Sequence, residues 1–141
     1  MDDPVLDSEK VARFYCKGDA IPFPIEGAKP KQYSYRAQPI LFEPRAEDDG
    51  GILATSVCRT RRGGAHLREA GKAYGGKRRR SLKGWFELHC SNVRKLLLEV
   101  EATASDLYDD HADIVRWPRD DQDQLRLCQE LARMASDAIQ A

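Results

Sequence analysis

Positive charge is gathered into one stretch of this chain, where it would suit a ligand that carries many negative charges. Residues 59–83 hold ten arginines and lysines against one acid, whereas residues 1–58 have a balance of −3 and residues 84–141 a balance of −6. The three balances sum to zero, so the net charge hides the segregation. The ten cations are Arg59, Arg61, Arg62, Arg68, Lys72, Lys77, Arg78, Arg79, Arg80 and Lys83. Such runs are typical of surfaces that neutralise phosphate groups and release their counterions.

Two aromatic residues accompany these cations. Tyr74 lies inside the run and Trp85 follows it, and aromatic rings stack on exposed bases in proteins that bind single strands. Glycine recurs through residues 59–84, which predicts a mobile loop whose backbone adapts to a phosphate chain. The first hypothesis is therefore a nucleic-acid site of low sequence specificity in the loop 59–83, formed by the ten cations with both aromatic residues. The alternatives are an acidic protein surface, a contact with the acidic C-terminal half of the same chain, or plain solvation of the loop. RNA is not distinguished from DNA.

A second charged group is acidic and favours a different class of function. Its members are Asp106, Asp109, Asp110, Asp113, Asp120, Asp121 and Asp123. Clustered at one end of a helical hairpin, they would imitate a phosphate backbone and occupy the basic groove of a nucleic-acid-handling protein. The alternative hypothesis is thus a protein–protein module, such as a small inhibitor or assembly subunit of a nucleic-acid-processing complex like those of phages and mobile elements. A solubilising surface is the simplest interpretation of the same residues.

Residue types that could bind a metal or act as nucleophiles lack the spacing that such sites need. Cys58, His66, His89 and Cys90 include no pair separated by two to four residues, the spacing that structural zinc sites favour. Cys58 or Cys90 could pair with a histidine, but nothing in the sequence places a third group to orient it. The chain has neither a phosphate-binding Gly-Lys-Ser/Thr loop nor a dinucleotide fingerprint. We therefore expect no metal and no cofactor, and catalysis ranks third after the two binding hypotheses.

Length and composition limit the fold. The 141 residues suit a single domain, and 41% are hydrophobic while 33% are charged. Four widely separated cysteines favour reduced, buried thiols. No apolar run approaches the length of a membrane span, and the acidic start Met1-Asp2-Asp3-Pro4 differs from a secretory leader. We therefore expect a cytoplasmic protein without a signal peptide or transmembrane segment.

The N-terminal elements are expected to be one helix and a small sheet. Asp3 and Pro4 are typical of a helix start and Gly18 of a helix end, which predicts an amphipathic helix over residues 4–17. Prolines and a glycine in residues 19–31 predict a loop.

Three runs after that loop have the composition of strands. Residues 33–36 alternate in polarity, and the apolar runs 40–44 and 52–58 flank an acidic segment. These patterns predict an antiparallel hairpin of 40–44 against 52–58, with an acidic loop between them and 33–36 as an additional strand.

An apolar seam at steps of four and three residues occupies much of the C-terminal part. It consists of Phe86, Cys90, Val93, Leu97, Val100, Ala104, Leu107, His111 and Ile114. No glycine or proline interrupts residues 85–117, so the seam predicts a long helix that Pro118 ends. Asp120 or Asp121 would cap a second helix that folds back onto the first. The same seam would also suit a homo-oligomer.

Together these patterns predict one α+β domain over residues 1–141. Its parts are an N-terminal helix with a small antiparallel β-hairpin or sheet in residues 1–58, a basic glycine-rich loop in 59–84, and a long C-terminal antiparallel αα-hairpin in 85–141. In this arrangement the basic loop binds nucleic acid, and the αα-hairpin presents the aspartates of the alternative hypothesis.

Overall fold

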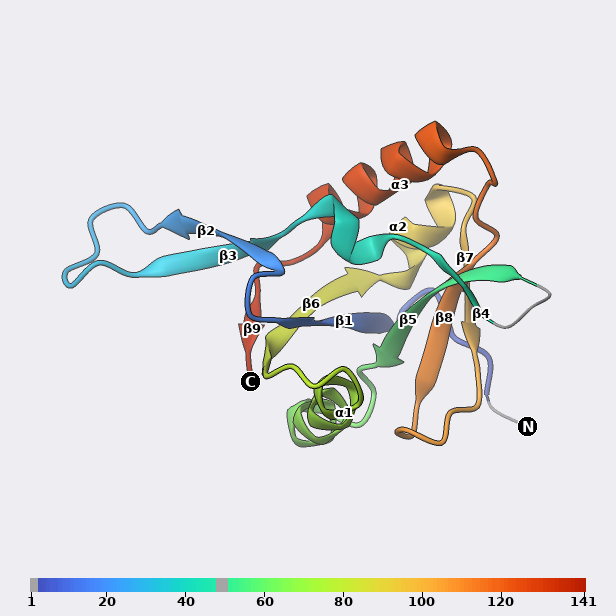
Figure 1. The fold of residues 1–141 in the computed structure, drawn as a ribbon, viewed down its shortest axis with the longest axis horizontal. Coiled ribbons are helices and arrows are strands. Elements are labelled where there is room, and N and C mark those ends of the chain that lie inside the picture. The colour runs from blue at the N-terminus through green and yellow to red at the C-terminus, as the bar shows by residue number, and fades with distance from the viewer. Residues whose placement is uncertain (1–2, 48–50) are drawn as a thin grey trace.

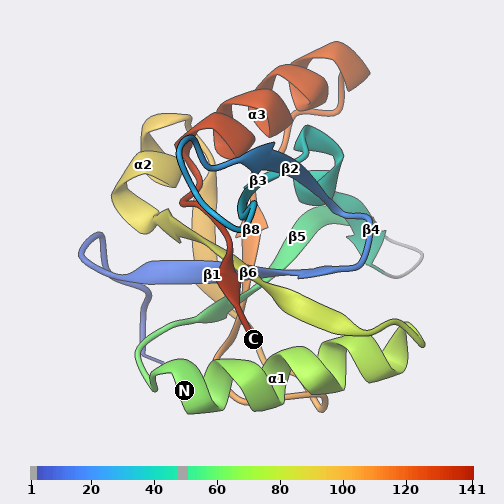
Figure 2. The same ribbon diagram turned by 90° about the vertical axis from the view of Figure 1, so that its left-hand side faces the viewer.

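An antiparallel sheet organises the molecule, with α1 on one face and η1, α2 and α3 on the other (Figures 1 and 2). The computed structural model describes residues 3–47 and 51–141. Six strands pair in the order β7-β8-β5-β1-β6-β9, and β4 joins this seven-stranded sheet by pairing with β5. The strands β2 and β3 form a separate hairpin that projects from the body (Figure 1).

The strands are β1 (Lys10–Cys16), β2 (Ala20–Pro24), β3 (Tyr33–Ala37), β4 (Arg45–Glu47), β5 (Ile52–Arg59), β6 (Leu82–His89), β7 (Glu99–Ala102), β8 (His111–Val115) and β9 (Ile139–Gln140). The helices are η1 (Pro39–Phe42), a 3₁₀ turn, and the α-helices α1 (Gly64–Lys77), α2 (Cys90–Lys95) and α3 (Asp121–Met134).

The predicted N-terminal helix is wrong, because its apolar residues form the central strand β1. Phe14 pairs with Trp85 of β6, and Ala12 pairs with Glu87. Phe14 packs on the α1 side, whereas its neighbour Tyr15 packs on the α3 side. A strand covered on both faces has a nearly continuous apolar sequence, and a short run of that kind resembles a buried helix.

The predicted glycine-rich loop is largely the helix α1. Its glycines permit close packing: a Cβ on Gly71 would lie 2.6 Å from Leu82 Cδ2, and one on Gly75 would lie 2.6 Å from the Arg80 carbonyl oxygen. A side chain at either position would push the helix away from the chain beneath it. Glycine therefore serves helix–sheet contact here, and the inference of a mobile loop is corrected.

The predicted long C-terminal helix is also wrong. Residues 85–117 are divided among β6, α2, β7 and β8, which leaves α3 without a helical partner for the predicted αα-hairpin. The chain turns at Asp110, which has a φ of 62°, and at Leu97, with a φ of 65°. Asp and Asn adopt this left-handed geometry more readily than most residues, so the aspartates mark a turn. The continuous seam on which the proposed homo-oligomer depended does not exist in this fold.

The predicted loop 19–31 is wrong in part, because residues 20–24 form the strand β2, which pairs with β3. Some other local predictions are confirmed. The expected strands 33–36 and 52–58 correspond to β3 and β5, and the expected final helix is α3, whose cap Asp120 accepts a hydrogen bond from the Asp123 backbone N–H at 2.9 Å. The partner of β5 in the predicted hairpin is β4 instead of residues 40–44, part of which form η1. Residues 48–50 of the expected acidic loop lie outside the described residues.

Two apolar clusters lie on opposite faces of the sheet. The larger lies beneath α2, α3 and η1, and the smaller lies between the sheet and α1. Within residues 3–47 and 51–141, no helix has both the length and the apolar composition needed to cross a bilayer.

Candidate functional site

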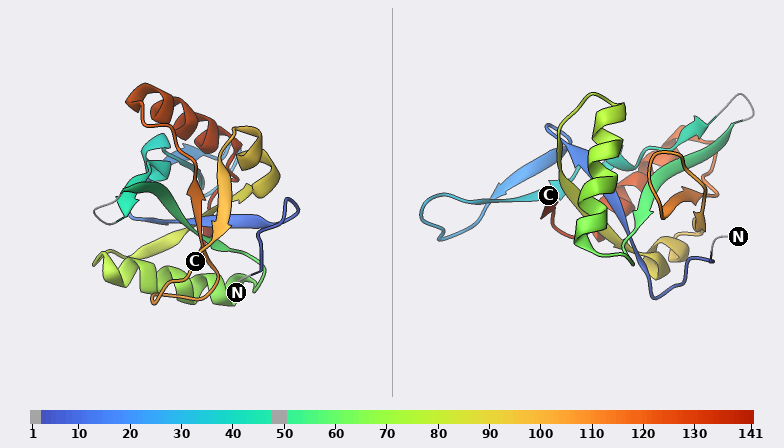
Figure 3. Two further views of the ribbon diagram at one scale, coloured as in Figure 1. Left: turned by 90° about the vertical axis from the view of Figure 1, so that its right-hand side faces the viewer. Right: turned by 90° about the horizontal axis from the view of Figure 1, so that it is seen from below.

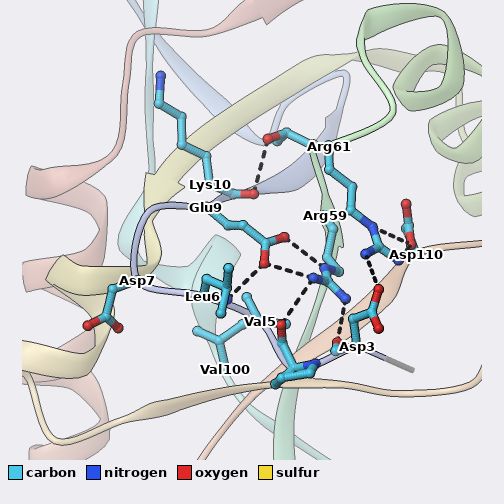
Figure 4. Close-up of polar contacts among 12 residues, drawn as sticks. Asp3, Val5, Leu6, Asp7, Glu9, Lys10, Arg59, Arg61, Val100 and Asp110 are labelled. Atoms are coloured by element: carbon cyan, nitrogen blue, oxygen red, sulfur yellow. Dashed lines mark hydrogen bonds and ion pairs between the residues drawn. The ribbon is translucent and has the colours of Figure 1, made fainter. Parts of the chain in front are cut away.

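The predicted cationic loop is divided between the two ends of α1, and its first arginine is buried in the fold. Arg59 ends β5 with only 2% of its surface exposed. Its Nε and Nη2 donate to the Glu9 carboxylate at 2.9 and 2.7 Å, and its Nη1 donates to the Asp3 carbonyl oxygen at 2.7 Å (Figure 4). The hydrogen bonds from Arg59 hold the pKa of Glu9 below its usual value. This arginine is engaged in holding the N-terminal segment against β5.

The next two arginines bind aspartates of the β7–β8 connection. Arg61 Nη2 lies 2.6 Å from Asp110 Oδ1, and Arg62 Nε lies 2.9 Å from Asp110 Oδ2. Arg62 also lies 3.6 Å from Asp109. These contacts, with the Arg61 hydrogen bonds as the largest cause, lower the pKa of Asp110, and the same carboxylate raises the pKa of Arg61. The positive charge at the N-terminal end of α1 is thus neutralised within the molecule.

The two aromatic residues proposed for base stacking are buried. Trp85 is 2% exposed, lies beneath α1 and donates its indole N–H to Glu87 at 3.3 Å. Tyr74 is 8% exposed, and its ring contacts the guanidinium groups of Arg13 at 5.6 Å and Arg78 at 4.4 Å. Both rings therefore serve packing and cation–π contacts, and neither presents a free face to a base.

The C-terminal end of α1 differs from the N-terminal end. Lys77, Arg78 and Arg79 are exposed, and no carboxylate of residues 3–46 or 51–141 lies at ion-pair distance from them. The Arg79 N–H donates to the Gly76 carbonyl oxygen and the Arg80 N–H to that of Gly75, a pattern that ends many helices. This turn fixes three charged side chains side by side at the end of the helix.

The remaining predicted cations lie around this turn. Arg68 and Lys72 are exposed on α1, and Lys83 is exposed on β6. Arg80 donates to the Lys17 carbonyl oxygen at 2.7 Å and to Asp19 at 2.9 Å, so its charge is shared with an acid.

A cleft of about 530 Å³ opens beside the end of α1. Tyr74, Lys77 and Arg78 of α1 line one side of it, and the connection between β7 and β8 lines the other. Ser56 of β5 and His111 of β8 also line it, and they lie on the face of the sheet that α1 only partly covers. Its volume is within the range of small-molecule sites.

Ser56 and His111 are joined by a hydrogen bond within this cleft. Ser56 Oγ lies 2.8 Å from His111 Nε2, and Thr103 Oγ1 lies 2.7 Å from His111 Nδ1. The carboxylate oxygen Asp113 Oδ1 lies 3.9 Å from Nε2. Both ring nitrogens therefore have hydroxyl partners, and the orientation of the imidazole is fixed.

A smaller cavity of about 230 Å³ continues past Tyr74 and Arg78. Arg13, Arg45 and Arg80 also line it. Arg13 is 7% exposed, and its Nε and Nη1 donate to the carbonyl oxygens of Leu41 and Ser56 at 2.8 and 2.9 Å. Burial lowers the pKa of Arg13, and the positive charges of Arg78 and Arg45 lower it further. The local field near Tyr74 is therefore favourable for anions.

The chain matches no protein-family model, no curated protein and no solved structure to a significant degree. The interpretation of the cleft therefore depends on its own geometry.

The seven aspartates of the alternative hypothesis do not form one surface. Asp109 and Asp110 bind arginines at the N-terminal end of α1, and Asp106 lies in the same connection. Asp113 is buried on the α1 face of β8, next to the cleft. Asp120, Asp121 and Asp123 begin α3 on the opposite side of the sheet. The acidic face expected of a helical hairpin is therefore absent from the described structure.

Sequence reasoning missed two polar residues that line the cleft, Ser56 and His111, the Thr103 hydroxyl that contacts His111, and Arg13. His111 fits the predicted helix seam, but it belongs to the strand His-Ala-Asp-Ile-Val. In a strand, His111 and Asp113 lie on the same face. Polar residues two apart in an otherwise buried strand were the available signal.

Thiol and metal chemistry find no support at this site. The cysteines 16, 58, 90 and 128 are buried and free, and burial raises the pKa of Cys58 to about 12. A thiol with that pKa is almost wholly protonated at neutral pH and is a poor nucleophile. No three His, Cys, Asp or Glu side chains in the described part of the chain gather as a metal site.

Proposed function

We propose that the protein binds the phosphate backbone of RNA or DNA with low sequence specificity, through the C-terminal end of α1 and the cleft beside it. The observation that supports this proposal is the exposed group Lys77, Arg78 and Arg79, which no described carboxylate neutralises by an ion pair. Arg68 and Lys72 extend the positive surface along α1, which is fully in view from below (Figure 3).

The proposed surface is smaller than the one expected from the sequence. Arg59 and Trp85 are buried, and Arg61 and Arg62 are paired with aspartates, so the proposal leaves them out. Lysine and arginine side chains that contact phosphates provide affinity without reading bases, which accounts for the low specificity expected. Each phosphate that they neutralise releases counterions, so binding should weaken steeply as salt rises.

Fluorescence anisotropy with labelled 20-nucleotide single strands, one RNA and one DNA, tests the proposal at several salt concentrations. Replacing Lys77, Arg78 and Arg79 together by alanine should weaken binding on the order of tenfold to a hundredfold at low salt. The slope of log affinity against log salt should also fall by about two, because each single-strand phosphate contact contributes about 0.7.

A matched control removes the same charge elsewhere. The variant Arg116→Ala/Arg119→Ala/Arg126→Ala loses three exposed arginines, two between β8 and α3 and one in α3, which packs on the other face of the sheet from α1. It should retain the affinity and salt slope of the unmodified protein. Equal losses in both triple variants would show a response to net charge alone and refute the proposed surface. Absence of any binding at low salt would refute nucleic-acid binding itself.

The second hypothesis, a protein–protein module, depended on an acidic helical hairpin, and residues 85–117 do not form one. Its aspartates lie on two sides of the sheet, and Asp110 is bound to Arg61 and Arg62. The arrangement therefore favours phosphate binding at the end of α1.

A further inference from the structure

The cleft contains polar side chains, whereas the neighbouring strands carry apolar side chains beneath α1. On the α1 face of the sheet, β1 and β6 contribute Phe14 and Trp85 to an apolar cluster, whereas β5 and β8 contribute Ser56, His111 and Asp113. On the opposite face, the neighbouring residues of the same strands pack in the core. Polar groups placed against a sheet cost stability unless they are paired, so their grouping in one cleft indicates a function.

Strand pairing holds these groups in place. Ser56 pairs with Asp113 and Cys58 with His111 in the antiparallel ladder between β5 and β8. The Thr103 backbone N–H donates to the His111 carbonyl oxygen at 3.0 Å, so the threonine is fixed beside the ring. Catalytic groups on adjacent strands are held more precisely than groups on loops.

The hydrogen bonds have the connectivity of an activated serine. With His111 Nδ1–H donated to Thr103 Oγ1 at 2.7 Å, the lone pair of Nε2 accepts the Ser56 hydroxyl proton at 2.8 Å. Thr103 then occupies the orienting position that a carboxylate holds in many serine hydrolases. The Asp113 carboxylate, 3.9 Å from Nε2, supplies negative charge near the ring when the ring takes up a proton.

The charges around the cleft select the class of electrophile. Lys77 and Arg78 line the same cleft as Ser56 and His111. Cations beside a nucleophile stabilise the charge on the oxygens of a phosphoryl group during transfer. An ester of phosphoric acid therefore matches the cleft better than an uncharged carboxylic ester.

We propose that the cleft catalyses hydrolysis of phosphate diesters, with Ser56 as nucleophile, His111 as general base and acid, and Thr103 as a positioning residue. The Ser56 oxygen attacks phosphorus while its proton passes to His111 Nε2. The new O–P bond forms, the bond to one ester oxygen breaks, and the departing alcohol takes the proton from His111. Water then attacks phosphorus in the phosphoserine diester and gives a proton to His111. The new O–P bond to water forms, the Ser56 O–P bond breaks, a phosphate monoester leaves, and the proton on His111 returns to the Ser56 oxygen.

This inference rests on the proposed function in one respect, the assumption that the physiological diester is a nucleic acid. Its chemistry can be tested without nucleic acid, by treating the full-length protein with a fluorophosphonate probe. The Ser56 oxygen would bond to phosphorus, fluoride would leave, and His111 would take the hydroxyl proton. Intact mass and peptide mapping should show one adduct per chain, located on Ser56.

Variants identify the roles of the three residues. Ser56→Ala should abolish labelling, and His111→Gln should slow it by on the order of a hundredfold, the usual contribution of a general base. Thr103→Val should slow labelling less and change its pH profile, because the imidazole loses the partner that fixes its tautomer. Ser8→Ala, which removes an exposed hydroxyl outside the cleft, should label at the normal rate.

The outcomes test the catalytic inference and the proposed function separately. No adduct on the folded wild-type protein, or an adduct that forms equally fast in His111→Gln, would overturn the catalytic inference. Hydrolysis of bis(p-nitrophenyl) phosphate that persists in Ser56→Ala would overturn it as well. The labelling experiment contains no nucleic acid, whereas a loss of RNA or DNA binding by the Lys77, Arg78 and Arg79 variant reports on the proposed function alone.

Discussion

The two ends of α1 carry the same kinds of side chain in opposite circumstances. Before the helix, Arg59, Arg61 and Arg62 are each bonded to a carboxylate of the chain itself. After the helix, the cations 77–79 are exposed and have no described carboxylate at ion-pair distance. Density of charge along a sequence therefore does not measure the charge that a ligand can reach.

The difference arises from topology. The N-terminal segment brings Glu9 to Arg59 across 50 residues of sequence, and the β7–β8 connection brings Asp110 to Arg61 across 49. At the other end of the helix, the same connection stands across a cleft from Lys77 and Arg78. One end is thus closed by long-range ion pairs, and the other is left open to a ligand.

The largest expected effect concerns the closed end. Arg59→Ala should lower the free energy of unfolding by about 3 kcal/mol, because it leaves Glu9 without its partner and opens a space at the end of β5. Urea unfolding followed by the fluorescence of the buried Trp85 and Trp117 measures this loss. Nucleic-acid affinity of the folded variant should stay unchanged, since Arg59 is buried and does not line the proposed cleft.

Arg61→Ala is the matched control at the same end. Arg61 is more exposed, with 37% of its side chain accessible, and Asp110 keeps Arg62 as a partner. Its loss should destabilise the protein much less than Arg59→Ala. Equal effects of the two substitutions would contradict the distinction between a buried structural pair and a surface pair.

The elements that could be predicted from sequence are those with a local signal. The Asp120 cap and acidic first turn identify α3, and the run of β-branched and apolar residues in 52–58 identifies β5. The strand β1 was missed because Val11, Phe14 and Tyr15 satisfy a helical spacing as well as a strand buried on both sides. Only the pairing of β1 with β5 and β6, which is long-range information, decides between the two.

Residues 85–117 show the same limit in a longer segment. Their apolar spacing fits a helix, yet Leu97 and Asp110 adopt left-handed conformations that interrupt it. The four aspartates from 106 to 113 indicate a turn, whereas the continuous phase of the apolar seam indicates a helix. A weak turn signal competes poorly with periodicity when no tertiary contact is known.

The candidate site could be predicted only in part. The cations 77–79 can be predicted from composition alone, and the structure shows that they are exposed. The pairing of Ser56 with His111 joins residues that are 55 apart in sequence, and it exists only because β5 and β8 are neighbours. Likewise, no local pattern shows that Arg59 would be covered by Glu9.

The second expected effect is the acid response of the closed end. Arg59 lowers the pKa of Glu9 in the folded state, and Arg61 and Arg62 lower that of Asp110. As pH falls through the unfolded-state pKa values near 4.5 and 3.8, the unfolded chain binds protons that the folded chain does not, so stability falls. The stabilisation is complete above these values and is lost as pH drops through the lower folded values.

Urea unfolding between pH 6 and pH 3 would measure this slope. Glu9→Gln and Asp110→Asn should each flatten it, because each removes one carboxyl whose pKa differs between the two states. Replacing the cations 77–79 by alanine should leave the slope unchanged, since these side chains hold no described carboxylate. A slope that depends on the cations 77–79 would show that the open end is paired in solution.

The smallest expected effect concerns Arg79, a charged residue in a left-handed backbone conformation that glycine would adopt at lower cost. Arg79 follows α1 with a φ of 55°, a position where glycine is usual, and Leu97 follows α2 with a φ of 65°. Glycine at either site removes the cost of the left-handed conformation and adds a smaller entropic cost, so each substitution should stabilise the protein by about 0.5 kcal/mol. Arg79→Gly should also weaken nucleic-acid binding by about threefold, because one phosphate contact is lost. Leu97→Gly should leave binding unchanged, and a weakening in both variants would show that the loss comes from the backbone and not from the charge.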